Sequence, residues 1–139
     1  MTNRYTVGGI VTDLSEEEVS DLPDFDALYG QTQIQSAADA NVFGAWSQIS
    51  ADIGTGKRLV YLMVTPDGSN ASAAYELEIG EGASTSEAAV TRALSPYFHA
   101  ATLAIFRLNR ALTDNARISV RARDGSGSAL YYDISIMVA

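Results

Sequence analysis

The stretch from Tyr75 to Glu87, YELEIGEGASTSE, constrains the fold more than any other part of the sequence. Up to Ile79, apolar residues alternate with Glu76 and Glu78, which is the period-2 pattern of a strand with one buried face. Two glycines and several small polar residues then break the pattern, and apolar residues resume at Ala88. The stretch therefore predicts a strand, a tight turn and a second strand, which together would form a corner of a β-sandwich.

Strand-length patterns recur along the rest of the chain. The segment 58–65 is almost continuously apolar, as in a central strand, whereas 116–123 alternates, with its arginines predicted outward or at edges. The segments 87–94 and 102–110 also fit short helical pieces, and we favour strands because the neighbouring segments have strand-like spacing. The predicted strands are 43–49, 58–65, 73–80, 87–94, 102–110, 116–123 and 130–138.

Turns rich in Gly, Asp, Asn and Ser separate these segments. We therefore expect an all-β protein, with an antiparallel β-sandwich, jelly-roll-like or Ig-like, over residues 36–139. Residues 1–35 are expected to form an extended acidic N-terminal arm or linker. The side chains predicted to lie mainly in the core are Trp46, Leu59, Tyr61, Leu62, Val64, Leu77, Ile79, Ile118, Val120, Ile134 and Ile136.

Composition narrows the class of protein. With 139 residues, 47% of them hydrophobic, the chain suits one globular domain with a real core. The formal net charge of −8 argues against direct binding to nucleic acid or to an anionic membrane, because both interactions need an excess of Lys and Arg. We expect neither a signal peptide nor a transmembrane span, and the absence of cysteine rules out disulfides and thiolate metal sites.

An acidic block distinguishes the N-terminal third. Residues 13–26 contain seven acidic residues and no basic one. Ser15 followed by Glu18 matches a capping box, which predicts a short helix that Pro23 ends. The block is either a solvated linker or an arm that packs on a partner through its interspersed apolar residues.

Five arginines lie in the C-terminal half of the chain, between positions 107 and 123. This asymmetry suits contact between copies, in which the acidic arm of one chain binds the basic face of the next. The alternative is that the arginines pair within the chain. The predicted partner-interface residues are Tyr5, Glu16, Glu17, Glu18, Phe25, Tyr29, Arg107, Arg110, Arg121 and Arg123.

The sequence offers no convincing catalytic group. His99 is the single histidine, and its neighbours supply neither a second metal ligand nor a carboxylate, so we interpret it as a loop or edge residue. Glu76 and Glu78 resemble the paired carboxylates of a glycosidase, but two such residues on the outer face of a strand are usually solvated surface charges. We therefore expect no catalytic residues and no enzyme activity.

Metal and cofactor motifs are equally weak. Asp52 and the 67–70 turn, DGSN, carry oxygens that suit Ca²⁺, but they lack the pattern of an EF-hand loop. The segment 54–57, GTGK, is similar to the end of a phosphate-binding loop, but the upstream glycine and the following helix are missing. We interpret both as turns and expect no metal and no cofactor.

Aromatic residues leave two alternatives open. They suit either a sugar-stacking platform or, as is more common, core and interface packing. The aromatic residues considered are Trp46, Tyr61, Tyr75, Tyr97, Phe98, Tyr131 and Tyr132.

The order of these features resembles that in small β-sandwich virion proteins of tailed bacteriophages. In that family a W-x-x-[IL] strand precedes a [DE]-[IL]-G-x-G-A-x-x-S-E turn and an R-I-[AS]-V-R strand. The resemblance covers residues 36–139 and leaves out the acidic N-terminal segment. The matching residues are Trp46 and Ile49, then Glu78 to Gly80, Gly82, Ala83, Ser86 and Glu87, and finally Arg117 to Arg121.

The resemblance implies a structural role in heads, tails or fibres. Our first expectation is a homo-oligomeric capsid decoration (cement) protein, with a trimer favoured, that binds the major capsid protein or other virion proteins. It would be made in the host cytoplasm and end on the capsid surface. The alternatives are a tail or fibre component and a carbohydrate-binding host-recognition module.

Overall fold

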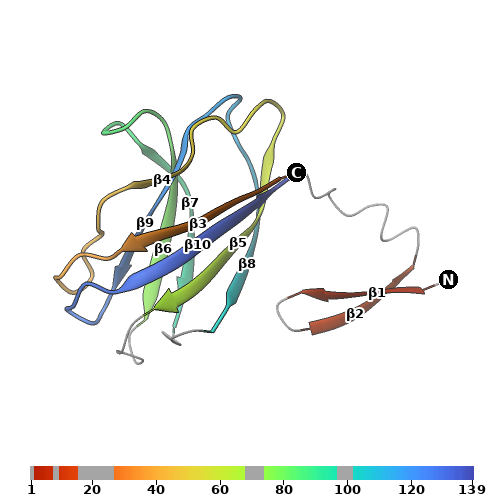
Figure 1. Cartoon of the computed structure of the whole chain (residues 1–139), viewed down its shortest axis with the longest axis horizontal. Coiled ribbons are helices and arrows are strands. Elements are labelled where there is room, and N and C mark those ends of the chain that lie inside the picture. The colour runs from red at the N-terminus through yellow and green to blue at the C-terminus, as the bar shows by residue number, and fades with distance from the viewer. Residues whose placement is uncertain (1, 8–9, 16–26, 68–73, 97–101) are drawn as a thin grey trace.

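The computed structural model describes residues 2–7, 10–15, 27–67, 74–96 and 102–139, with side chains from Thr32 onward (Figure 1). The described part is all-β, and it includes no helix long and apolar enough to cross a membrane. Its strands are β1 (Thr2–Val7), β2 (Ile10–Ser15), β3 (Ala27–Gln35), β4 (Ser47–Ser50), β5 (Arg58–Asp67), β6 (Tyr75–Glu81), β7 (Ala88–Ser95), β8 (Ala104–Ala111), β9 (Ile118–Asp124) and β10 (Tyr131–Val138).

Two four-stranded antiparallel sheets form a β-sandwich. The β3 sheet has the order β3-β10-β5-β8, and the β4 sheet has the order β4-β9-β6-β7. The pairing is nested, because β3 lies beside β10, β4 beside β9, β5 beside β8 and β6 beside β7. The chain thus crosses between the sheets at every connection from β3 onward except the β6–β7 hairpin.

The predicted strands are confirmed as elements, with shifted ends. The segments 87–94 and 102–110, for which helical pieces were the alternative, are the strands β7 and β8. The strand predicted over 43–49 is shorter, and begins only at Ser47. The strand β3 starts at Ala27 and pairs with β10 over its full length, so the sandwich includes a strand from the segment that the sequence assigned to the arm.

The N-terminal residues form a sheet of their own. β1 and β2 pair as an antiparallel hairpin, with Thr2 opposite Ser15 and Val7 opposite Ile10. This two-stranded sheet shares no strand with the sandwich. Ser15, the predicted cap of the short helix, is the last residue of β2, whereas residues 16–22 of that predicted helix and the turn residues 68–70 lie outside the described residues.

The core fills the space between the sheets with alternate residues of their strands. Nine of the eleven predicted core residues are buried there, and the other two predictions are wrong. Trp46 and Tyr61 are both partly exposed and stand outside the core cluster. Tyr61 alternates with the buried Leu62 in β5 and therefore lies on the outer face of the β3 sheet.

A buried carboxylate holds together the end of the sandwich at which β9 turns into β10. The Tyr132 hydroxyl donates to Asp124 Oδ2 at 2.8 Å, and the Ser126 amide donates to Oδ1 at 3.0 Å. Ser36, just after β3, also hydrogen-bonds Asp124 and accepts a hydrogen bond from the Leu130 amide. Burial opposes ionisation of Asp124, but these hydrogen bonds outweigh it and lower the pKa of the carboxyl.

We predict that Asp124→Asn lowers the free energy of unfolding by about 1–3 kcal/mol at pH 7, because the amide turns a donor toward groups that donate. The folded-state pKa lies below the ordinary value of 3.8, so the carboxylate stabilises the fold above that pH. This stabilisation is lost as the pH falls through the folded-state pKa. The free energies of unfolding of Asp124→Asn and the parent should therefore become more similar at low pH.

Urea unfolding followed by the fluorescence of the single tryptophan measures this difference. Asp133→Asn is the matched control, because Asp133 is exposed on β10, the next strand in the sequence. A loss of stability that is the same for both variants, or independent of pH, would contradict the assigned role of Asp124.

Candidate functional site

The outer face of the β4 sheet carries a ladder of opposite charges. Register in the sheet places Glu76 opposite Arg123 and Glu78 opposite Arg121 on β9. On the other side of β6, Arg92 of β7 lies opposite Glu78. Each carboxylate thus has an arginine beside it on a neighbouring strand, which is the favourable arrangement for cross-strand pairs.

The ion pairs of this ladder are close. Arg121 Nε donates to Glu78 Oε1 at 2.8 Å, and Arg121 Nη2 contacts the same oxygen. Arg92 Nε lies 2.8 Å from Glu78 Oε2, as an ion pair that lacks the alignment of a hydrogen bond. Arg123 donates through Nε and Nη2 to Glu76 Oε2, at 2.8 and 2.5 Å.

Two aromatic rings cover the ladder. The Arg121 guanidinium lies 4.3 Å from the centroid of Trp46 and 4.4 Å from that of Phe43. Arg123 lies 4.7 Å from the Phe43 centroid. These are cation–π distances, which hold the rings against the sheet. We call the set of Phe43, Trp46, Glu76, Glu78, Arg92, Arg121 and Arg123 the charged clasp.

The prediction that Glu76 and Glu78 are solvated is wrong. Both lie on the outer face, as expected, but the Glu78 side chain is 0% exposed and that of Glu76 is 12% exposed. The sequence alone could not show that Phe43 and Trp46 fold back over this face. The charge pattern could nevertheless have predicted the cross-strand pairs, because Glu-x-Glu at 76–78 and Arg-x-Arg at 121–123 have the same spacing.

The segment before β4 brings the rings into position. The Asn41 amide donates to the Asp124 carbonyl at 2.6 Å, and the Gly44 amide donates to the Ala122 carbonyl at 2.9 Å, so the segment runs along β9. The Trp46 ring then lies over Gly80, where an added Cβ would come within 2.7 Å of Trp46 Cη2. A glycine at position 80 therefore makes room for the indole outside the core.

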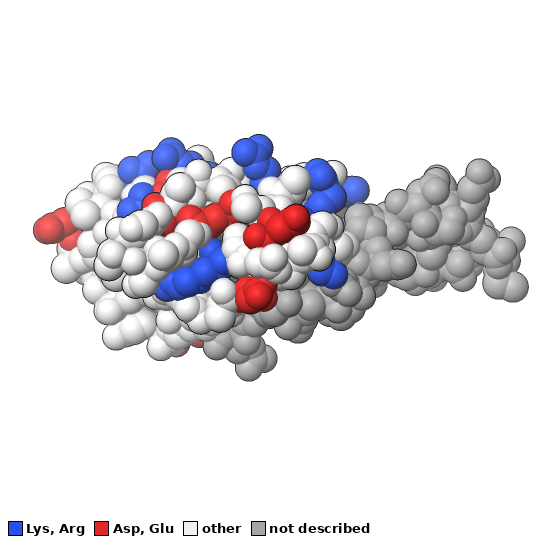
Figure 2. Space-filling view, turned by 90° about the horizontal axis from the view of Figure 1, so that it is seen from above, with Lys and Arg blue, Asp and Glu red and all other residues white. Residues whose placement is uncertain are grey.

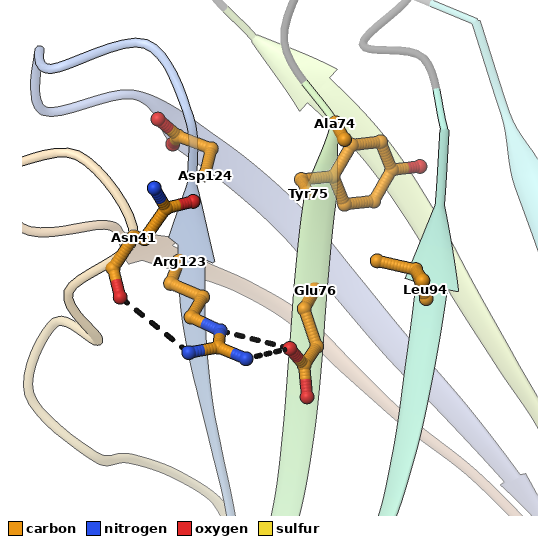
Figure 3. Close-up of a pocket in the computed structure, with 7 residues that line it drawn as sticks. All are labelled: Asn41, Ala74, Tyr75, Glu76, Leu94, Arg123 and Asp124. Atoms are coloured by element: carbon orange, nitrogen blue, oxygen red, sulfur yellow. Dashed lines mark hydrogen bonds and ion pairs between the residues drawn. The ribbon is translucent and has the colours of Figure 1, made fainter.

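A cavity of about 320 Å³ adjoins the clasp (Figure 3). Within it the Arg123 guanidinium lies between the Glu76 carboxylate and the Asn41 carbonyl oxygen, which is 3.5 Å away. Leu94 borders the cavity and is 67% exposed. The charged groups that line this cavity already have partners, so it offers a ligand little free charge.

The predicted interface residues divide into three groups. Arg121 and Arg123 belong to the clasp, where they pair within the chain. Arg107 and Arg110 are exposed on β8, an edge strand, and neither forms an ion pair with another described residue. Only the strand is described for Tyr5 (β1) and Tyr29 (β3), whereas Glu16, Glu17, Glu18 and Phe25 lie outside the described residues.

Residues 52–57, which were considered for metal or phosphate binding, form a turn. Asp52 Oδ1 accepts a hydrogen bond from the Gly54 amide at 2.9 Å, and Gly54 and Gly56 have positive φ angles of 84° and 66°. The Gly56 amide donates to Asp114 at 2.9 Å. Within the described ranges no three His, Asp or Glu residues group so as to hold a metal ion, and His99 lies outside them.

The aromatic residues that the structure describes are spread over separate parts of the sandwich and do not form one platform. Tyr75 and Tyr132 are buried in the core, with ring centroids 5.2 Å apart. Trp46 belongs to the clasp, Tyr61 lies on the outer face of the β3 sheet, and Tyr131 is 43% exposed. Tyr97 and Phe98 lie outside the described residues.

Comparison with known proteins assigns the chain to no family. No protein-family model matches the sequence, and no curated protein matches it significantly.

We predict that Glu78→Ala lowers the free energy of unfolding by about 3–5 kcal/mol, because it leaves Arg121 in the clasp without its carboxylate. Arg92→Ala should cost less than about 1 kcal/mol, because the Arg92 side chain is 61% exposed and water can replace it. Ser119→Ala is the control on the same sheet face, since the Ser119 hydroxyl is buried without a hydrogen-bond partner among the described residues. Equal losses for all three variants in urea unfolding would contradict the clasp.

A second prediction concerns Gly80. In Gly80→Ala the new methyl would push the Trp46 ring off the sheet, so the fluorescence emission should shift to the red and stability should fall by about 1–3 kcal/mol. Gly125→Ala is the control, because a Cβ there meets nothing closer than 3.9 Å. Unchanged emission from Gly80→Ala would show that the indole does not lie over this residue.

Proposed function

We propose that this chain is a non-enzymatic structural protein of a tailed-bacteriophage virion, and that it decorates the capsid as a cement protein. The observation that carries the proposal is the nested strand order, which favours a jelly roll over an Ig-like sandwich. Of the eight strands, the first pairs with the last, the second with the second-last, and so on inward. The chain thus forms one long hairpin that is wound into two sheets. Jelly rolls of this kind form viral capsid domains and also lectins.

A fold alone does not define a function, so the sequence supplies the second argument. The motifs that resemble phage virion proteins fall on the elements of the clasp. Trp46 covers the ladder over Gly80 of β6, and Gly82 lies in the turn between β6 and β7. The Arg117–Arg121 motif begins one residue before β9 and continues into its first half. Arg117 also binds the Gly82 carbonyl and Glu87, which lowers the pKa of the Glu87 carboxyl.

These contacts give the resemblance a physical meaning. The shared motif residues tie the β6–β7 turn and β9 into one rigid sheet, which is a scaffold role. Such a role suits a protein whose task is to reinforce a shell.

The distribution of charge along the chain supports the proposal that the N-terminal arm contacts a neighbouring protein. Residues 13–26 are acidic without a basic residue, while Arg107 and Arg110 are exposed on the open edge of the β3 sheet. On the face seen in Figure 2, basic and acidic side chains lie among one another, so the body has no broad basic patch there. We infer that the arm binds the β8 edge of a neighbouring copy or a capsid protein, with a trimer as the favoured assembly.

We predict that deletion of residues 1–26, which leaves β3 whole, gives a folded sandwich that no longer binds phage heads. Circular dichroism should retain its β-sheet signal, while co-sedimentation with undecorated heads and the resistance of those heads to heat should be lost. If the truncated chain decorates heads as well as the full chain does, the arm does not mediate attachment.

Charge reversal tests the β8 edge separately. The double variant Arg107→Glu with Arg110→Glu should assemble or bind heads at least about tenfold more weakly, and the defect should shrink at high salt. Asp133→Lys, an exposed charge change on β10, should leave binding unchanged. Binding that survives the double reversal would contradict the proposed contact. A chain that is found only on tails would contradict the cement role and support the tail or fibre alternative.

A further inference from the structure

A second cavity lies where the edge strand β3 meets the segment that leads into β4. Its volume is about 530 Å³, within the range of small-molecule sites. Gln33 and Gln35 of β3 form one side, and Phe43 and Ser47 form the other. Tyr131, at the start of β10, also lines the cavity, and register places it opposite Gln35.

The lining of this cavity is neutral. The described residues that line it include no Asp, Glu, Lys or Arg, although the chain as a whole carries a net charge of −8. Its available polar groups are the amides of Gln33 and Gln35 and the hydroxyl of Ser47. None of these three side chains has a hydrogen-bond partner among the described residues. Amides and hydroxyls can both donate and accept, so they match a ligand that bears hydroxyl groups.

Aromatic surface completes the site. Tyr131 is 43% exposed, and its ring offers an apolar body with a polar tip. Of the aromatic residues considered for a sugar platform in the sequence, Tyr131 is the one that lines this cavity. An aromatic ring beside free amides suits the alternating apolar and hydroxylated faces of a sugar.

The charged clasp holds the far wall in place. Phe43 packs on the guanidinium groups of Arg121 and Arg123, and its neighbour Gly44 lies so close to β3 that an added Cβ would come within 2.0 Å of the Gln35 carbonyl oxygen. The wall is therefore fixed before any ligand arrives, and preorganisation of this kind reduces the entropic cost of binding.

We propose that this cavity is a binding site for a neutral glycan and holds one or two of its sugar residues. The lining favours uncharged glycans over sialylated or sulfated ones, because no arginine or lysine faces an anionic group. This inference does not depend on where the chain sits in a virion.

An array of immobilised neutral, sialylated and sulfated glycans, probed with the full chain, tests the proposal. Titration calorimetry with the best free oligosaccharide then separates recognition of the sugar itself from avidity on the array. We expect binding to neutral glycans only. Tyr131→Ala should weaken it at least about tenfold, and Gln35→Ala by several-fold.

The matched control is Tyr61→Ala, which removes a partly exposed tyrosine from the outer face of the same sheet but outside the cavity. It should bind as the parent does. The absence of binding to any neutral glycan, binding confined to anionic glycans, or binding that Tyr131→Ala leaves unchanged would each overturn the proposal. Head binding by Tyr131→Ala should equal that of the parent, so this test and the test of the cement role fail separately.

Discussion

The rest of the structure depends on the burial of one carboxylate on the outside of a sheet. Glu78 is fully enclosed although it points away from the core, and an unpaired charge in such a place would cost several kcal/mol. Arg121 must therefore stay beside it, whereas water can replace the exposed Arg92. The Arg121 guanidinium is in turn held between Phe43 and Trp46, so an ion pair on the sheet fixes the path of a segment far away in the sequence.

The path of this segment shapes both the charged clasp on the β4 sheet and the neutral cavity beside β3. The segment from Asn41 to Ser47 runs along β9, covers the ladder and forms the wall of the neutral cavity beside β3. Rigid support and a preformed binding surface thus arise from the same contacts. Arg121 and Arg123 pair within the clasp, so of the arginines predicted to bind a partner only Arg107 and Arg110, on the β8 edge, are left for the proposed contact with the acidic arm.

Local sequence patterns predict the buried interior well, because apolar and polar residues must alternate in a strand that has one solvent-exposed face. The alternation placed Leu77, Ile79, Ile118 and Val120 in the core. It could not place Trp46, since hydrophobicity does not tell the inside of a sandwich from an outer face that another segment covers. It failed for Glu78 for the same reason. The rings that cover Glu78 belong to Phe43 and Trp46, which are distant from it in the sequence. Glu78 and Arg121 in turn come together only through the register of β6 against β9.

The strand order was likewise beyond local patterns. Turn residues separate the strands but do not state which strand pairs with which, so jelly-roll-like and Ig-like sandwiches looked alike in the sequence. The nested pairing, which supports the proposed jelly roll, is visible only once the hydrogen-bonded neighbours of each strand are known. The neutral cavity was hidden for the same reason, because Gln35 and Tyr131 are adjacent only through the pairing of β3 with β10.

We propose that a tailed phage encodes this chain, and electron cryo-microscopy of purified virions of that phage tests this central claim most directly. The account predicts density for the eight-stranded sandwich on the outer surface of the capsid, grouped in threes, with the N-terminal residues reaching a neighbouring copy or the capsid shell. Intact particles that bear no density for the chain, and no peptide from it in mass spectrometry, would contradict the account.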